Sequence, residues 1–304
     1  MSRDRTHDEG STSGFSLVAV LVFMLIVSAI VAPFAVMART RLMIANNEVE
    51  QERLSLLAEG LANVISSELT DASAKEKLPL DSTPTGCQSG KFTIDVRIQD
   101  HDGLIDLNAA DAHLLSQGFA SLGVDAQASE ALAEAAIQFR TSANAFAVQA
   151  EPQASPVGPT ENKQAPFESV SELQEFVALT STSLPDLYET FTVNSKRGTV
   201  SLDLAPNRLR TILADASESS ASVTAAAAEG SAYTVEVTAR HAGSGIAGQV
   251  GFIVGALPTN AGGFRRLSRS PIAEPPVSPE SSKAASCDAL FGAEAAEILR
   301  RQGS

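Results

Sequence analysis

Histidine and acidic side chains are the residues that could perform catalysis or hold a metal ion here, and their spacing favours neither. His7, His101, His113 and His241 show none of the short-range spacings that metal sites use. The chain contains no G-x-S-x-G nucleophile motif and no H-E-x-x-H pair. The Asp-His-Asp run at residues 100–102 is more typical of a hairpin turn than of a catalytic or metal site. We therefore expect a protein that is not an enzyme, with no catalytic residue, cofactor or metal.

The two cysteines of the chain could form a disulfide bond. Cys87 and Cys287 are the two cysteines of the chain, too few for a disulfide scaffold or a cysteine zinc cluster. They could pair in an oxidising compartment or remain free thiols. Because 199 residues lie between them, the sequence leaves both states open.

The composition of the chain indicates its domain number and argues against nucleic acid as a partner. The chain has 304 residues, 44% of them hydrophobic, which is enough for about two domains with buried cores. Its 22 basic residues stand against 36 acidic ones, a net charge of −14. A chain this acidic does not bind nucleic acid by neutralising phosphates.

One apolar run near the N-terminus dominates the sequence pattern. Residues 15–38 hold 24 positions without a charge, and as a helix they span about 36 Å, enough to cross a bilayer. Pro33 lies inside this run and is expected to kink it. Three interpretations compete: a secretory signal cleaved after Ala38, an uncleaved anchor, or a segment processed on its N-terminal side.

The helix is expected to continue beyond the apolar run. Residues 39–70 contain no Pro. Their apolar positions recur at helical spacing, namely Leu54, Leu57, Leu61, Ile65 and Leu69. Such a stripe predicts that this half of the helix packs against a soluble domain.

The part of the chain after residue 90 shows strand patterns and an internal sequence repeat. Residues 91–100 alternate apolar and polar, which predicts a strand, and 233–240 with 246–254 predict a hairpin. The segment G-L-I-D-L-N-A-A at 103–110 recurs 95 residues later as G-T-V-S-L-D-L-A-P at 198–206. Each copy predicts a turn Gly, a short strand, a capping Asn or Asp and a new helix.

The residues before the apolar run resemble the leader of type IV prepilins. Residues 1–14 are short and polar and end in Gly14, within the motif G-F-S-L at 14–17. In that family a membrane peptidase cleaves after the Gly and methylates the new N-terminus. The resemblance therefore implies a leader over 1–14, cleavage between Gly14 and Phe15, N-methylation of Phe15, and a transmembrane helix over 15–38.

One departure sharpens this resemblance. Most pilin-like proteins carry Glu as the fifth residue after the cleavage site, where it is thought to pair with the terminal amine of a neighbouring subunit. Ala19 occupies that position here. Among type II secretion pseudopilins, the K family usually lacks this Glu. A subunit without the Glu suits the end of a fibre rather than its middle.

The soluble part resembles the K family of type II secretion minor pseudopilins more closely. That family shows G-x-I-N-L-N-T-A twice, flanking an inserted helical domain, and both repeat copies match this pattern in order. Residues 131–140, 166–173 and 187–193 resemble segments of its insert. The resemblance covers about residues 14–256.

Four features depart from the family's pattern. A loop rich in Asp is missing after residue 140, and three residues are replaced: Phe139 stands for Trp, and Asp106 and Ser201 stand for Asn. Some family members bind calcium, but no ligand positions match here, so calcium binding does not carry over.

The resemblance implies an α+β fold, in which a pilin-like long N-terminal helix, transmembrane in its first half, packs on an antiparallel sheet. Residues 39–108 and 191–256 would form the pilin-like domain, with strands over 91–106, 191–203 and 233–254. Residues 109–190 would form an inserted all-helical domain. We expect a low-complexity tail over 257–304, mobile at 265–282 with a short helix at 287–301, and a second mobile segment at 149–166.

The implied function is mechanical. The resemblance implies a minor pseudopilin at the tip of the pseudopilus, priming fibre assembly for protein export across the outer membrane. Its implied partners are minor pseudopilins of types I and J, the prepilin peptidase and the inner membrane, with no nucleic acid and no small-molecule substrate. It would be anchored in the inner membrane by a single pass, with its soluble domain in the periplasm.

The sequence is also compatible with two other functions. The chain could be an unprocessed single-pass periplasmic adaptor. Its insert also resembles the helix-hairpin-helix modules of DNA-uptake proteins, with a turn at residues 122–125. Residues 103–190 contain twelve acids against Arg140 and Lys163, a net charge of −10, which argues against DNA binding.

Overall fold

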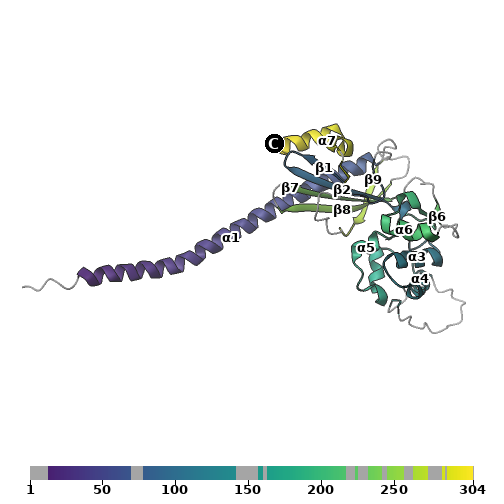
Figure 1. Cartoon of the computed structure of the whole chain (residues 1–304), viewed down its shortest axis with the longest axis horizontal. Coiled ribbons are helices and arrows are strands. Elements are labelled where there is room, and N and C mark those ends of the chain that lie inside the picture. Colours follow the sequence, from purple (N-terminus) through teal and green to yellow (C-terminus); the bar gives the residue numbers. More distant parts are fainter. Residues whose placement is uncertain are drawn as a thin grey trace, which may run out of the picture. The chain divides into compact units, whose positions relative to one another are not determined.

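The structure is a computed structural model, shown in Figure 1. It describes the following residues: 13–69, 78–141, 157–159, 163–216, 223–224, 232–241, 245–256, 263–272, 283–284 and 286–303. The chain divides into two compact units, Met1–Glu52 and Arg53–Ser304. Each unit is described by itself.

Helix α1 (Ser13–Glu68) begins in the first unit and ends in the second. Pro33 lies inside it without ending it. The predicted stripe is confirmed: Leu54, Leu61, Ile65 and Leu69 are buried, and Leu57 is half-buried against them. These residues share a core with the central strands, as the spacing of three and four predicts.

The main sheet of the second unit has six strands in the order β10-β1-β2-β7-β8-β9. All neighbours are antiparallel except β10 and β1, which are parallel. The strands are β1 (Thr85–Ser89), β2 (Phe92–Asp100), β7 (Ala232–His241), β8 (Ala247–Ala256), β9 (Phe264–Arg269) and β10 (Lys283–Ala284). The predicted strand at 91–100 and the hairpin of β7 and β8 are both confirmed.

One face of this sheet holds the first core. On β2, Ile94, Val96 and Ile98 are buried, and Asp95 and Arg97 alternate with them. Helix α1 covers the buried face at very close range. A Cβ added at Gly248 of β8 would lie 2.1 Å from the α1 backbone at Leu54 and Ser55. Glycine is therefore required at this point of β8.

The second core lies between β2 and β7 in the sequence. Its buried residues run from Ile105 to Leu213, with aromatic contacts of 4.8 Å and 5.5 Å from Phe139 to Phe167 and Phe176. Its helices are α3 (Ala112–Ser121), α4 (Ala126–Arg140), α5 (Leu184–Tyr188) and α6 (Asn207–Ala216). Its 3-10 helices are η1 (His101–Gly103), η2 (Val170–Glu175), η3 (Val177–Leu179) and η4 (Leu202–Leu204). Its strands are β3 (Ile105–Asp106), β4 (Phe191–Thr192), β5 (Val200–Ser201) and β6 (Val223–Thr224).

The internal repeat is confirmed as a structural repeat. Strands β3 and β5, and helices α3 and α6, begin and end at positions 95 residues apart. The two turn glycines pack on the opposite copy. A Cβ at Gly103 would lie 2.1 Å from the carbonyl oxygen of Leu204, and one at Gly198 would lie 3.0 Å from that of Ala109. Glycine at these turns therefore lets the copies approach each other.

Side chains of the first copy also tie the insert together. The Asn108 amide donates to the Phe167 carbonyl at 2.9 Å and accepts from the Phe167 N–H at 2.7 Å. Arg140, at the end of α4, donates to the carbonyls of Leu107 and Ala110. These hydrogen bonds hold three segments together in space: the first repeat copy, the end of α4 and the segment around Phe167.

Three expectations about strands and tail were wrong. The strand expected over 91–106 ends at Asp100, because residues 101–103 form η1 and residues 105–106 form β3 outside the main sheet. Residues 191–203 do not join the main sheet: β4 pairs with β3 and β5 pairs with β6, in separate two-stranded sheets. Their pairing partners belong to the second core, so short local strands replace the long return strand. Residues 265–269, expected to be mobile, lie in β9, which pairs with β8. Most of 149–166 lies outside the described residues.

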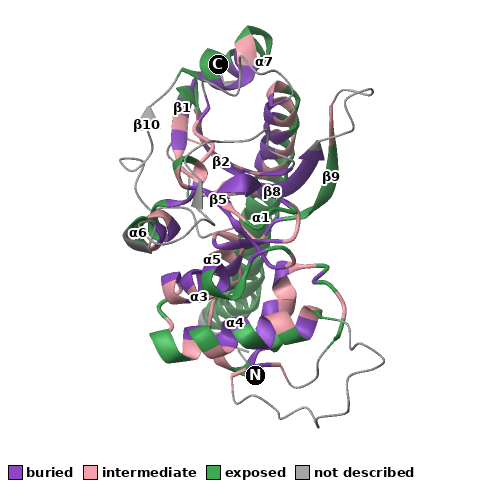
Figure 2. Ribbon diagram, turned by 90° about the vertical axis from the view of Figure 1, so that its right-hand side faces the viewer, coloured by how far each residue is buried: buried purple, intermediate pink, exposed green. Residues whose placement is uncertain are grey.

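The expected C-terminal helix is present and covalently joined to the sheet. Helix α7 (Cys287–Gly303) contributes Leu290, Phe291 and Leu299 to the first core. Figure 2 shows that α7 is buried in part and exposed in part. Cys87 and Cys287 form a disulfide with a Cα–Cα distance of 5.3 Å. The question that the sequence left open is thus answered in favour of pairing.

Substituting Gly248 tests the approach of α1 to the sheet. We expect Gly248→Ala to lower the free energy of unfolding by about 1–3 kcal/mol, because the new methyl overlaps the α1 backbone. The matched control is Gly245→Ala, where an added Cβ meets nothing within 4 Å. Urea unfolding followed by circular dichroism measures both. Equal stability of the two variants would contradict the close approach.

Reducing the disulfide tests the attachment of α7. Reduction, or Cys287→Ser, is expected to lower the free energy of unfolding by about 2–4 kcal/mol, because the cross-link restricts the unfolded chain. Thiol titration of the unreduced protein in urea should find no free thiol. Two free thiols, or unchanged stability on reduction, would contradict the pairing.

Candidate functional site

The N-terminal part of α1 is the first candidate site. Every described side chain from residue 16 to residue 49 is exposed, although most of residues 16–38 are apolar. This part of α1 is long and apolar enough to cross a membrane, with a mean hydropathy of 2.9 over its most apolar window. Exposed apolar side chains on this scale need lipid or another apolar surface to cover them.

The predicted processing residues lie at the beginning of this helix. The backbone at Gly14 and Phe15 is helical, directly after Ser13, where α1 begins. Ala19 is exposed one turn further on. Nothing in the geometry tests cleavage or methylation, so both stay predictions.

The Asp-His-Asp run at residues 100–102 is not a hairpin turn, contrary to expectation. Residues 101–103 form η1, which leads from β2 into the second core. The His101 ring lies 2.6 Å from the Thr192 hydroxyl and 2.9 Å from the Thr234 hydroxyl. Burial lowers the pKa of His101 to about 3. The ring therefore stays neutral at ordinary pH and joins the two cores by hydrogen bonds.

The neighbouring Asp102 is also structural. Its carboxylate is buried and forms an ion pair with Arg197 at 3.2 Å. Burial raises the pKa of Asp102, and the Arg197 charge lowers it. His113 lies on α3, and His241 at the end of β7 packs edge-on against Phe92. Among the residues that the structure describes, no three His, Cys, Asp or Glu residues gather in a way that could hold a metal.

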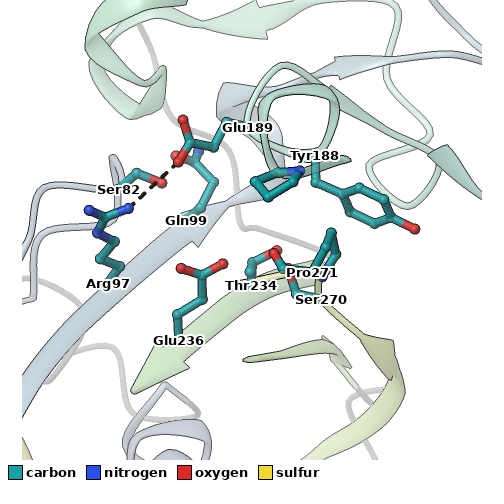
Figure 3. A pocket seen from close by; sticks show the side chains of 10 residues that line it. Ser82, Arg97, Gln99, Tyr188, Glu189, Thr234, Glu236, Ser270 and Pro271 are labelled. Carbon is teal, nitrogen blue, oxygen red and sulfur yellow. Dashed lines mark hydrogen bonds and ion pairs between the residues drawn. The ribbon is translucent and has the colours of Figure 1, made fainter. Parts of the chain in front are cut away.

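A second candidate site was missed by the sequence analysis. A cavity of about 20 Å³ lies between the main sheet and the second core. Figure 3 shows Glu236 of β7 and Glu189, directly after α5, facing the same space, with Arg97 of β2 beside them. Arg97 is the cross-strand neighbour of Glu236 and forms an ion pair with Glu189 at 3.6 Å.

The two carboxyl groups that line this cavity both have pKa values above the usual range of glutamate. Burial raises the pKa of Glu236 to about 7, with a smaller opposing effect from Arg97 and a further rise from Glu189. Burial likewise raises the pKa of Glu189, and Arg97 lowers it. One arginine thus faces two carboxylates that both resist ionisation. The signal in the sequence was the polar side of β2, which includes Arg97.

Replacing Glu236 tests its raised pKa. A carboxyl with a raised folded pKa stabilises the fold fully below its unfolded pKa of about 4.5, and this contribution is lost as pH rises through 7. Glu236→Gln should therefore match the wild type near pH 5 and exceed its stability by about 1–3 kcal/mol at pH 8.

The measured quantity is the difference in the free energy of unfolding between Glu236→Gln and the wild type at each pH. His101 has a lowered pKa, so its own contribution is lost as pH falls below about 6.5 in both proteins. The matched control is Glu175→Gln, an exposed carboxylate on η2. Urea unfolding at several pH values gives the differences. A Glu236→Gln difference that does not change with pH would show that Glu236 titrates normally.

Comparisons with known proteins give a similarity in structure rather than in sequence family. No protein-family model matches the chain, and no curated protein matches it. A chain of the crystal structure of the GspK-GspI-GspJ complex from the enterotoxigenic Escherichia coli type 2 secretion system is similar in structure. The match covers 78% of this chain and 99% of that chain, with 12% sequence identity and a TM-score of 0.46. The chain is thus similar in structure, at low sequence identity, to a component of that complex.

Proposed function

We propose that this chain is a minor pseudopilin of the K type, which sits at the tip of a type II secretion pseudopilus and primes fibre assembly. The observation that carries the proposal is the division of α1. One uninterrupted helix leaves the apolar side chains of residues 16–38 exposed and buries Leu54, Leu61 and Ile65 in a folded domain. A subunit built this way can be held by lipid before assembly and by neighbouring apolar helices afterwards.

The alanine at position 19 supports a position for this subunit at the end of a fibre. Helix α1 carries no acidic side chain before Glu48. Its N-terminal part therefore has no carboxylate to offer the terminal amine of a neighbouring subunit. Such a subunit can begin a fibre, since nothing precedes it there.

The size of the second core also supports a position at the tip of the fibre. Its buried residues, from Ile105 to Leu213, form a folded mass of their own beside the pilin-like sheet. A subunit with this extra mass is harder to repeat along a narrow fibre than to place at its end. The proposed partners are minor pseudopilins of types I and J and the prepilin peptidase. The proposed location is the inner membrane, with the soluble domain in the periplasm.

Processing of the N-terminus tests the class of protein. We expect the membrane-purified protein to begin at N-methylated Phe15 in cells that have their prepilin peptidase, and at Met1 in cells without it. Intact mass and the N-terminal peptide measure this. Gly14→Val should block cleavage, whereas Gly10→Val, elsewhere in the predicted leader, should not.

Two other starts would each overturn the proposal. A start at Met1 in the presence of the peptidase would indicate an unprocessed single-pass adaptor. A start at Arg39 would indicate a signal cleaved after Ala38 and a released domain.

A further inference from the structure

Strand β9 is the outermost strand of the main sheet, at the margin seen in Figure 2. Among the described residues it pairs with β8 alone, and residues 265–269 are all exposed. The N–H of Ser270, which follows β9, donates to the Gly251 carbonyl at 3.0 Å. Because hydrogen-bonded pairs alternate along an antiparallel ladder, the backbone N–H and C=O of Arg269 point the other way, toward the free edge. An edge of this kind is a template for a further strand.

The charge of β9 is opposite to that of the chain as a whole. The strand carries three arginines and no acidic residue, in a chain with a net charge of −14. Arg266 forms an ion pair with Glu59 of α1 at 3.1 Å. In the part of the chain that the structure describes, Arg265 and Arg269 form no ion pair. Charge therefore favours an acidic strand as the partner. A second copy of β9 would place arginines against arginines, which is unfavourable.

A cavity beside β9 can receive a side chain of such a strand. Its volume is about 150 Å³, comparable to a cavity that holds one benzene molecule. Its lining is more apolar than polar and includes Leu267 of β9, Ile253 of β8, and Val170 and Val193 of the second core. Because Leu267 is exposed as well, the cavity reaches the surface at β9.

The two faces of β9 present different chemistry to a partner strand. Side chains of paired residues lie on the same face of a sheet. Arg269 is opposite Phe252, which belongs to the first core, so Arg269 lies on the same side of the sheet as α1. Ser268 is opposite Ile253, and both line the cavity on the other side. A partner strand of alternating pattern thus meets Arg269 with one set of side chains and the cavity with the other set.

We propose that the free edge of β9 binds an extended acidic segment of a partner protein as an additional antiparallel strand. The backbone of this segment pairs with that of Arg269, and its acidic side chains lie beside the Arg269 guanidinium. An apolar side chain of the segment enters the cavity at Leu267. Backbone pairing gives the affinity, and the charge and the cavity give the specificity. This inference does not depend on the proposed function, because it needs neither cleavage nor a membrane.

A fluorescent synthetic peptide in which Glu and Val alternate tests the inference. We expect saturable binding to the full-length protein in detergent, measured by fluorescence anisotropy and weakened by salt. In antiparallel pairing, the peptide residue opposite Arg269 directs its N–H toward β9. N-methylation of the Glu amides should therefore abolish binding, whereas N-methylation of the Val amides, which point to solvent, should keep it.

Variants of the protein test the charge of the edge. Arg269→Glu should weaken binding by about fivefold. Arg301→Glu is the matched control, because it makes the same change of charge at an exposed position on α7 and should bind as the wild type does. Circular dichroism checks that both variants are folded.

Three results would overturn the inference. The first is equal binding of the two N-methylated peptides, which would mean that the backbone does not pair. The second is unchanged binding by folded Arg269→Glu. The third is a peptide-free dimer that forms a disulfide cross-link through Ser268→Cys, because a second copy would then occupy the edge.

Discussion

The close contact between α1 and the sheet is the constraint on which the rest of the structure depends. At Gly248 the helix backbone lies so near the strand that no side chain fits between them. This contact places Leu54, Leu61 and Ile65 in the first core and fixes where the buried part of the helix begins. Among the described residues, the apolar side chains of residues 16–38 are exposed, and apolar surface on this scale needs lipid or another apolar surface to cover it.

The second core depends on a different use of glycine. Gly103 and Gly198 let the two repeat copies meet, and Asn108 ties the first copy to Phe167. His101 and Gln99 then join this core to the main sheet by hydrogen bonds. The cavity at Glu236 lies at this junction, between β2, β7 and the end of α5.

Local patterns predicted much of this fold. The stripe of α1, the alternation of β2 and the repeat at an offset of 95 residues each depend on neighbours in sequence, and each is confirmed. The errors came from distant partners. Residues 265–269 were expected to belong to a mobile, low-complexity tail, but they pair with β8, and Phe191 pairs with β3 rather than with the main sheet. The Glu236 cavity needs β2, β7 and the end of α5 together, which no local pattern reveals.

The central claim is that α1 passes, without interruption, from an apolar environment into the folded domain. Single nitroxide labels at Leu21, Phe34 and Leu56 of the full-length protein in bilayers test it, because all three side chains are exposed in the structure. Accessibility to oxygen and to a water-soluble nickel complex should show Leu21 and Phe34 in lipid and Leu56 in water. If Leu21 and Leu56 were equally accessible to nickel, the N-terminal part of α1 would not lie in the membrane, and the account would be wrong.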